Sequence, residues 1–253
     1  MDLQLEGKRA LVTGGSKGIG RAIARQLALE GVDVVIAARN AAELAEAASA
    51  LAAETGRRVI GHAVDTRLDD SVKALVAQAA KVLGGLDILV NAAGKPGGQA
   101  PPPKLAAITD ALFWDDVDVK VMGYLRMARE AAPYMAAQGW GRIINISGLA
   151  ARSTGSTIGS MRNVAVAALS KNLADELGPQ GINVTVVRAA RAAAGGKSEA
   201  QVEAGMASNV TIGRLVDAAE VADIVAFLAS PRSVAINGDA IACGGGIRGA
   251  IHY

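Results

Sequence analysis

The sequence has few of the residues that would mark several classes of protein. It contains a single cysteine, Cys243, which excludes an internal disulfide. Aromatic residues make up 3% of the chain, so Ala, Val, Leu and Ile must build most of its core. No uncharged apolar run reaches the ~18 residues of a membrane span, and residues 1–8 lack the apolar stretch of a signal peptide. These absences predict a cytoplasmic protein without a membrane segment.

The sequence also lacks an excess of positive or negative charge. Lys and Arg together number 26 and Asp and Glu 24, which gives a net charge of +2. No run of one sign appears, and this argues against nucleic acid as a partner. A chain of 253 residues that is 51% hydrophobic can bury a substantial core. We therefore expect a globular protein that acts on a small molecule, and the sequence predicts no metal site.

Short apolar runs alternate with helical patterns along the whole chain. The expected strands are residues 9–12, 32–37, 58–64, 86–90, 141–146, 181–187 and 240–242. The expected helices are residues 21–29, 41–54, 69–83, 109–118, 119–137, 159–177 and 217–229, with Asp69, Asp70 and Ser71 as a cap. This alternation predicts a single α/β domain over residues 1–253. Its core is a doubly wound parallel sheet of about seven strands with helices on both faces.

A glycine-rich turn, residues 13–20, joins the first expected strand to the first expected helix. Its glycines remove the Cβ atoms that would keep a phosphate away from the backbone. The free N–H groups and the positive dipole end of the helix would face that phosphate. The residues predicted to bind a dinucleotide here are Gly14, Ser16, Lys17, Gly18, Ile19 and Gly20. The alternative is a plain strand–helix turn, because the spacing G-x-x-x-G-x-G is not the commoner G-x-G-x-x-G.

Four stretches resemble motifs of the short-chain dehydrogenase/reductase family. Residues 13–20 resemble its T-G-x-x-x-G-I-G turn, and residues 141–147 and 173–184 resemble its G-R-I-I-N-I-S and L-A-x-E-L-G-x-x-G-I-x-V runs. Its N-A-A-G motif is matched by Asn91, Ala92, Ala93 and Gly94. The match covers nearly the whole chain. The resemblance implies a Rossmann-like fold, a nicotinamide cofactor across the carboxyl ends of the strands, and a homotetramer.

The residues after the second and third expected strands bear on the choice of cofactor. An NAD-binding member would carry an acid after the second strand, but Ala38 and Arg39 stand there, and Lys17 adds a second cation. Two cations without an acid suit the 2′-phosphate of NADP, so NADP is predicted and NAD is the less favoured choice. The alternative is that both cations are solvated. Asp65 and Thr66 resemble the family's adenine contact, or else form a simple helix-capping turn.

The catalytic part of the resemblance is interrupted. The family uses a Ser, a Tyr as general acid/base, a Lys four residues later, and an Asn. The Tyr position falls at Gly159 and the Lys position at Asn163, and no tyrosine lies between Ile146 and Leu173. Ser147 lies close to the Ser position, although Gly148 aligns at least as well. Lys120 stands where the family has its Asn.

The chemistry of these replacements suggests roles for some of them. Lys120 in a dry pocket would have a pKa near neutrality and serve as acid or base; the alternative is a solvent-reaching lysine at a helix end. Asn163 can still bond the ribose of the cofactor. Arg162 would bind an anionic substrate or else lie at the surface, and Arg188 precedes Ala189 and Ala190, where the family has Pro-Gly.

Three functions follow as alternatives. The first is an NADP(H)-dependent oxidoreductase that acts on a small carbonyl or alcohol, with Lys120 and Ser147 as catalytic residues and a replaced proton donor. The second is a lyase or isomerase that uses Lys120, and the third is an inactive nucleotide-binding regulator. The loops 95–104 and 189–207 carry no readable substrate signature. The tail 251–253 is a further candidate, because His252 or Tyr253 would supply an acid to a neighbouring subunit unless the tail is disordered.

Overall fold

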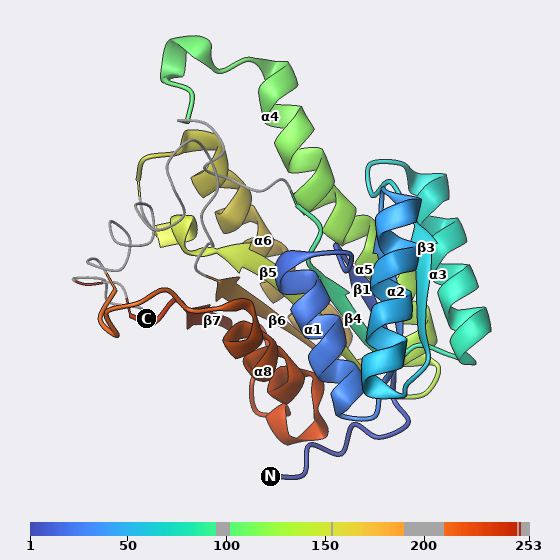
Figure 1. The fold of residues 1–253 in the computed structure, drawn as a ribbon. Helices are drawn as coiled ribbons and strands as arrows, with labels where there is room; N and C mark the ends of the chain where they lie inside the picture. The colour runs from blue at the N-terminus through green and yellow to red at the C-terminus, as the bar shows by residue number, and fades with distance from the viewer. Residues whose placement is uncertain (95–101, 153, 190–209, 247, 249–253) are drawn as a thin grey trace.

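Seven parallel strands form one sheet in the order β3-β2-β1-β4-β5-β6-β7 (Figure 1). The structure is a computed structural model, and it describes residues 1–94, 102–152, 154–189, 210–246 and 248. The strand order reverses direction between β1 and β4, which is the place where a doubly wound sheet opens a crevice for ligands. The predicted fold class is confirmed.

The strands and helices agree closely with the expected ranges. The strands are β1 (Arg9–Thr13), β2 (Asp33–Ala38), β3 (Val59–Ala63), β4 (Ile88–Asn91), β5 (Gly141–Gly148), β6 (Ile182–Ala189) and β7 (Ala240–Cys243). The α-helices are α1 (Gly18–Leu29), α2 (Ala41–Thr55), α3 (Asp69–Leu83), α4 (Asp110–Val117), α5 (Gly123–Ala136), α6 (Thr157–Leu177) and α8 (Ala218–Ala229). The short helices are η1 (Leu105–Ala107), η2 (Asp118–Met122), η3 (Leu149–Arg152), η4 (Gly178–Gln180) and η5 (Pro231–Ser233).

Helices cover both faces of the sheet. Helices α1, α2 and α8 pack on the face turned to the viewer in Figure 1, and α3, α5 and α6 pack on the other. Successive strand residues alternate between the two layers, so Val12 and Ile36 join the first core while Leu11 and Val35 join the second. Strands buried on both faces read as continuous apolar runs, which is why the sequence located them.

Helix α3 begins without the side-chain cap that was expected. Its N-cap is Leu68, which makes no capping hydrogen bond. Asp69 and Asp70 lie inside the first turn, where a carboxylate favours the positive end of the helix dipole without closing the cap. Ser71 instead accepts a hydrogen bond from the backbone N–H of Asp65. The predicted cap of residues 69–71 is therefore wrong.

The two helices expected at 109–118 and 119–137 form one continuous rod. Helix α4 runs into the π-helix η2, which runs into α5 without a break. In Figure 1 the first residues of α4 project beyond the carboxyl edge of the sheet. The wider π turn re-aims the residues that it carries, Lys120 among them, and such turns are frequent at functional sites.

Several predicted features lie outside the described residues. These are most of the loop 95–104, nearly all of the stretch 189–207, and the tail 251–253. In the part of the chain that the structure describes, no helix is both long enough and apolar enough to cross a membrane.

Candidate functional site

The glycine turn after β1 forms a cradle at the start of α1. A Cβ on Gly14 would stand 2.7 Å from the Ala92 carbonyl oxygen, and one on Gly20 would stand 2.2 Å from the Gly14 carbonyl oxygen. Gly18 has a φ of +56° and no atom within 4 Å of its Cβ position, so the space in front of it is open. Helix α1 begins there, and its N-cap Lys17 makes no side-chain hydrogen bond. Open N–H groups at a helix start beside a space that only glycine leaves free fit a phosphate.

The other residues of this turn anchor it or face solvent. Ser16 is buried, and Ile19 packs against the core under α1. Lys17 is 78% exposed, and its Nζ lies 3.5 Å from a carboxylate oxygen of Glu43 in α2. Ser16 and Ile19 therefore lie on the covered side of the turn, and Lys17 lies on its outer side beside Glu43.

The N-A-A-G turn after β4 is fastened to the glycine turn. The Thr13 hydroxyl oxygen accepts hydrogen bonds from the backbone N–H groups of Ala92 (3.1 Å) and Ala93 (3.3 Å). The Asn91 amide donates to Asn145 Oδ1 (2.9 Å) in β5, and the Asn145 amide donates to Ser170 Oγ (2.8 Å) in α6. These bonds fix the carboxyl ends of β1, β4 and β5, where the sheet binds ligands. Gly94 leaves this edge open toward Lys120.

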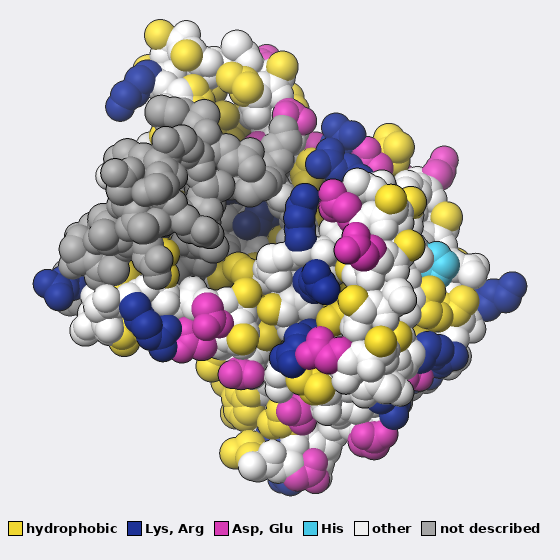
Figure 2. All heavy atoms as spheres, viewed as in Figure 1, with side chains coloured by type: hydrophobic (Ala, Val, Ile, Leu, Met, Phe, Trp, Pro, Cys, Tyr) yellow, Lys and Arg dark blue, Asp and Glu magenta, His cyan; other side chains and the backbone are white. Residues whose placement is uncertain are grey.

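A cleft of about 320 Å³ lies at the carboxyl ends of β2 and β3. Its lining residues are Arg39, Ala63, Val64, Asp65 and Ser71. Arg39 is exposed, and it stands directly before the start of α2, whose first turn carries Glu43, the partner of Lys17. Figure 2 shows Lys and Arg side chains gathered around the hollow near the upper ends of α1 and α2. Two cations therefore flank the same end of the sheet, as the sequence predicts.

Asp65 and Thr66 are bound into the turn between β3 and α3. The Arg67 guanidinium beside Asp65 holds the pKa of that carboxyl below its usual value, with an Nη2–Oδ2 distance of 2.6 Å. Asp65 also accepts the Arg67 backbone N–H (3.1 Å), which is the capping-type turn of the alternative interpretation. Thr66 is buried, and its hydroxyl donates to the Val119 carbonyl oxygen (3.4 Å) in η2. Thr66 thereby ties this turn to the π-helix.

Ser147 and Asn163 come together on the α5/α6 face of the sheet. Ser147 lies near the end of β5 and donates from Oγ to Asn163 Oδ1 (3.1 Å) in α6, and both residues are buried. A Cβ on Gly148 would meet Asn163 Nδ2 at 3.0 Å, so the backbone and the amide are already in close contact. Gly159 lies in the first turn of α6 and donates its N–H to Ser156 Oγ (3.2 Å). Ser147 and Asn163 form a polar pair, and Gly159 presents no side chain.

Lys120 extends from η2 toward the N-A-A-G turn. The residue is partly exposed, and its Cδ lies 3.8 Å from the Cβ position of Gly94. Burial lowers the pKa of Lys120 to about 7; the Arg162 charge adds to this effect, and Asp116 partly opposes it. The lowered pKa fits the dry pocket, and the partial exposure fits a solvent-reaching lysine, so the dry pocket stays a prediction.

Sequence reasoning missed three residues around Lys120 and Ser147. Tyr124 lies one turn after Lys120, and its hydroxyl donates to the Ile146 carbonyl oxygen (2.9 Å). Asp116 in α4 forms an ion pair with Arg162. Arg188 was noted only for its neighbours, yet it is buried. The helical spacing of Asp116, Lys120 and Tyr124 is a signal for a shared face, whereas the burial of Arg188 has no signal in the sequence.

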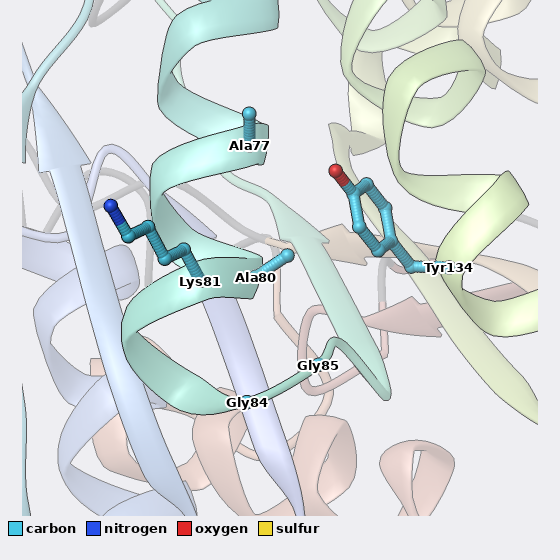
Figure 3. A pocket seen from close by; sticks show the side chains of 6 residues that line it. All are labelled: Ala77, Ala80, Lys81, Gly84, Gly85 and Tyr134. Carbon is cyan, nitrogen blue, oxygen red and sulfur yellow. The ribbon is translucent and has the colours of Figure 1, made fainter.

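A second depression, of about 350 Å³, lies far from these residues. It is bounded by the end of α3, by Gly84 and Gly85 before β4, and by Tyr134 of α5. Figure 3 shows the Tyr134 hydroxyl pointing toward α3, while Lys81 points away from it. Its polar side chains do not converge, and it lies at the amino ends of the strands. We therefore place the candidate site at the carboxyl edge of the sheet.

Comparisons with known proteins place this arrangement in a family. The family model described as enoyl-(acyl carrier protein) reductase matches residues 14–248. The chain is 33% identical to the 3-oxoacyl-acyl-carrier-protein reductase FabG of Haemophilus influenzae, over 96% of this chain and 99% of that protein. It is 32% identical to the short-chain reductase protein NovJ of Streptomyces niveus, over 94% of this chain and 92% of that protein.

Solved structures agree with the sequence comparisons. The L-sorbose reductase of Gluconobacter frateurii, solved in complex with NADPH and L-sorbose, superposes with a TM-score of 0.90 at 30% identity. The match covers 99% of this chain and all of that one. The matches agree with the glycine cradle and with the hydrogen bonds that join it to the N-A-A-G turn. The chain belongs to the short-chain dehydrogenase/reductase family.

Proposed function

We propose that this protein is an NADP(H)-dependent oxidoreductase that interconverts a small carbonyl compound and its alcohol, with Lys120 as proton donor. The observation that carries the proposal is the position of Lys120, whose side chain reaches the carboxyl edge of the sheet beside Gly94. A general acid works best when its pKa lies near the working pH, and that of Lys120 is about 7.

The cofactor is held by the residues at the ends of β1 to β4. The cradle of Gly14, Gly18 and Gly20 takes the pyrophosphate, with Ser16 and Ile19 fixing the turn. The exposed cations Lys17 and Arg39 bind the 2′-phosphate, Asp65 and Thr66 border the adenine, and Asn91 to Gly94 border the nicotinamide half. Support comes from the open cradle and from the L-sorbose reductase that was solved with NADPH.

The proton reaches the substrate from Lys120. Bound NADPH supplies the hydride to the carbonyl carbon. The Lys120 ammonium gives its proton to the carbonyl oxygen, which becomes the alcohol, and the neutral amine regains a proton from water. The Ser147 hydroxyl donates its one proton to Asn163 Oδ1. It would bond the carbonyl oxygen only after turning away from that amide.

Tyr124 is a poor candidate for the same role. It is buried, burial raises its pKa, and its hydroxyl is committed to the Ile146 carbonyl. On α6, Gly159 and Asn163 are the residues that the resemblance places at the family's Tyr and Lys positions, and neither side chain is an acid. These observations support a replaced proton donor on η2.

Turnover of Lys120→Met tests the proposal. With L-sorbose and a 3-oxobutanoyl thioester as probes, the native protein should consume NADPH, and its reduction rate should fall as the pH rises above ~7, because the acid form is lost. Lys120→Met should lose ~10²–10⁴-fold in rate and show no such pH profile, while NADPH affinity stays within a few-fold. Lys73→Met, on the exposed side of α3, is the matched control and should behave as native.

Two results would contradict the assignment. Fast reduction by Lys120→Met with an unchanged pH profile would place the donor elsewhere. Tight NADPH binding with no consumption of NADPH by the native protein would favour the alternative of a nucleotide-binding regulator or a non-redox enzyme.

A further inference from the structure

Two arginines near Ser147 and Lys120 take no part in proton transfer. Arg188 has 6% of its surface exposed, and the side chain of Arg162 is almost as well covered. The Nε atom of each is buried and has no hydrogen-bond partner. Buried polar atoms are nearly always satisfied, so both Nε atoms need an explanation. The Arg162 charge is paired with Asp116, whereas a buried charge without such a pair costs several kcal/mol.

Arg188 lies beside the Ser147–Asn163 pair. In the register of β5 and β6, Arg188 is the partner of Ser147. Val186, two residues earlier on the same face, packs with Tyr124 and Val166. Because strand side chains alternate between faces, Arg188 points into the same layer, next to Ser147.

Two pairs of like charges lie near these residues. Lys120 and Arg162 repel each other, and so do Arg188 and Arg152. Asp116 forms an ion pair with Arg162. Within the described ranges of the chain, no carboxylate forms an ion pair with Arg188. The site therefore holds a buried guanidinium that an incoming anion would neutralise.

We propose that the substrate carries an oxyanion, such as a carboxylate or a phosphate, in addition to its carbonyl, and that Arg188 binds this group. The guanidinium presents planar N–H donors that match an oxyanion, and its position beside Ser147 brings the anion next to the carbonyl site. Arg162 is already paired with Asp116, so the unneutralised guanidinium is that of Arg188. This inference rests on the proposed function, because it names the class of substrate that the oxidoreductase takes.

Calorimetry on the native protein saturated with NADP⁺ tests the inference without turnover. The probes are 2-oxobutanoate, 3-oxobutanoate and 4-oxopentanoate, each against its methyl ester, and dihydroxyacetone phosphate against dihydroxyacetone. At least one anionic probe should bind ~10–100-fold tighter than its neutral partner, as a charge-assisted hydrogen bond predicts. A preference for an oxo acid over its ester indicates a carboxylate site, and a preference for dihydroxyacetone phosphate over dihydroxyacetone indicates a phosphate site.

Variants of Arg188 assign the preference to this residue. Arg188→Met should bring the ratio of anionic to neutral affinity close to one, and Arg188→Lys should keep part of it, while NADP⁺ affinity stays within about threefold. Arg129→Met, at an exposed and ion-paired arginine of α5, is the matched control and should keep the native ratio. If Arg188→Met fails to fold, Arg188→Gln replaces it, and the same loss of the anionic-to-neutral affinity ratio is expected.

Three outcomes separate this inference from the proposed function. A native protein that prefers none of the anionic probes overturns it, even if neutral ketones are reduced. An Arg188→Met protein that loses NADP⁺ affinity but keeps the ratio also overturns it, because Arg188 then belongs to the cofactor site. A clear preference in a protein that never consumes NADPH upholds the anion site and rejects the oxidoreductase.

Discussion

Arg39 follows β2 at the position where a carboxylate would favour NAD(H) and a cation favours the 2′-phosphate of NADP(H). Arg39→Ala should weaken NADPH binding by ~10–100-fold, because a charge-assisted contact to phosphate contributes ~1.5–3 kcal/mol. NADH affinity should hardly change. Calorimetry with both cofactors measures the two effects, and Arg25→Ala, whose arginine pairs with Glu54 on the surface, serves as control. Equal affinity of the native protein for NADPH and NADH would count against the assignment.

Lys120 should also make the stability of the protein depend on pH. Its folded pKa of about 7 lies below the ~10.4 of an unfolded lysine, so between these values the unfolded chain binds more protons. The free energy of unfolding therefore rises with pH across this window, and the cost of burying the charge is largest below pH 7. Lys120→Met should be more stable than the native protein by ~1–3 kcal/mol at pH 6.

Urea unfolding at pH 6, 8 and 10 checks this expectation. The advantage of Lys120→Met should shrink steadily toward pH 10, where the native amine is neutral in the folded state. A constant difference across the three pH values would mean that Lys120 does not lie in a dry pocket.

At the residue scale, the sequence shows which residue type stands at a position better than it shows what surrounds that residue in the fold. The sequence shows the cation Arg39 directly after an expected strand, and it places Lys120 where the resemblance expects an Asn, which stays a prediction. The contact of Ser147 with Asn163 and the burial of Arg188 are not visible in the sequence, because they arise from strand register and from the packing of α6 on β5. Strand register and helix packing both depend on residues that are far apart in the sequence.

At the scale of elements, the π-helix η2 is held by a close approach between Gly123 and Thr66. A Cβ on Gly123 would stand 3.0 Å from Thr66 Cβ and Oγ1, which are fixed by the turn before α3. Gly123→Ala should therefore shift the start of α5 and destabilise the protein by ~1–3 kcal/mol, as overpacking does. It should also lower turnover, because Lys120 moves with η2.

A double-mutant cycle measures this coupling. Thr66→Ala removes the Oγ1 atom that the new Cβ would meet and leaves the Thr66 Cβ position in place, so the double variant should recover part of the lost stability. Gly139→Ala changes a glycine with open space around it but a φ of +67°, and it shows the effect of backbone strain alone. Additive losses in the Gly123/Thr66 cycle would mean that the two residues do not touch.

The regular helices and strands could be predicted from the sequence, whereas the π-helix η2 could not. Buried parallel strands such as β1 and β5 are short apolar runs between turn residues, and amphipathic helices repeat every three to four residues. A π turn changes the hydrogen-bond pattern without changing the residue types, so η2 is not visible in the sequence. The predicted cap of α3 was wrong for a similar reason, because Asp69 and Asp70 suit either the N-cap or the first turn of a helix.

At the scale of the whole molecule, exposed apolar side chains gather on the rod and the helix that border the site. Met161 and Val164, one turn apart on α6, are 52% and 51% exposed, and Leu112 and Trp114 of α4 are also exposed. Helix α4 packs on α6, so these side chains lie on neighbouring elements. Exposed apolar groups on adjacent helices are typical of an interface between subunits.

We expect a homotetramer, in which α5 and α6 of one subunit pair with those of another. Light scattering at micromolar concentration should give the mass of a tetramer. Val164→Arg should lower that mass, because a two-fold interface carries the substitution twice and buries two like charges without partners. Leu29→Arg, at an exposed leucine of α1, is the control and should leave the mass unchanged. A monomeric native protein would reject the assembly, and an unchanged mass in Val164→Arg would move the interface away from α6.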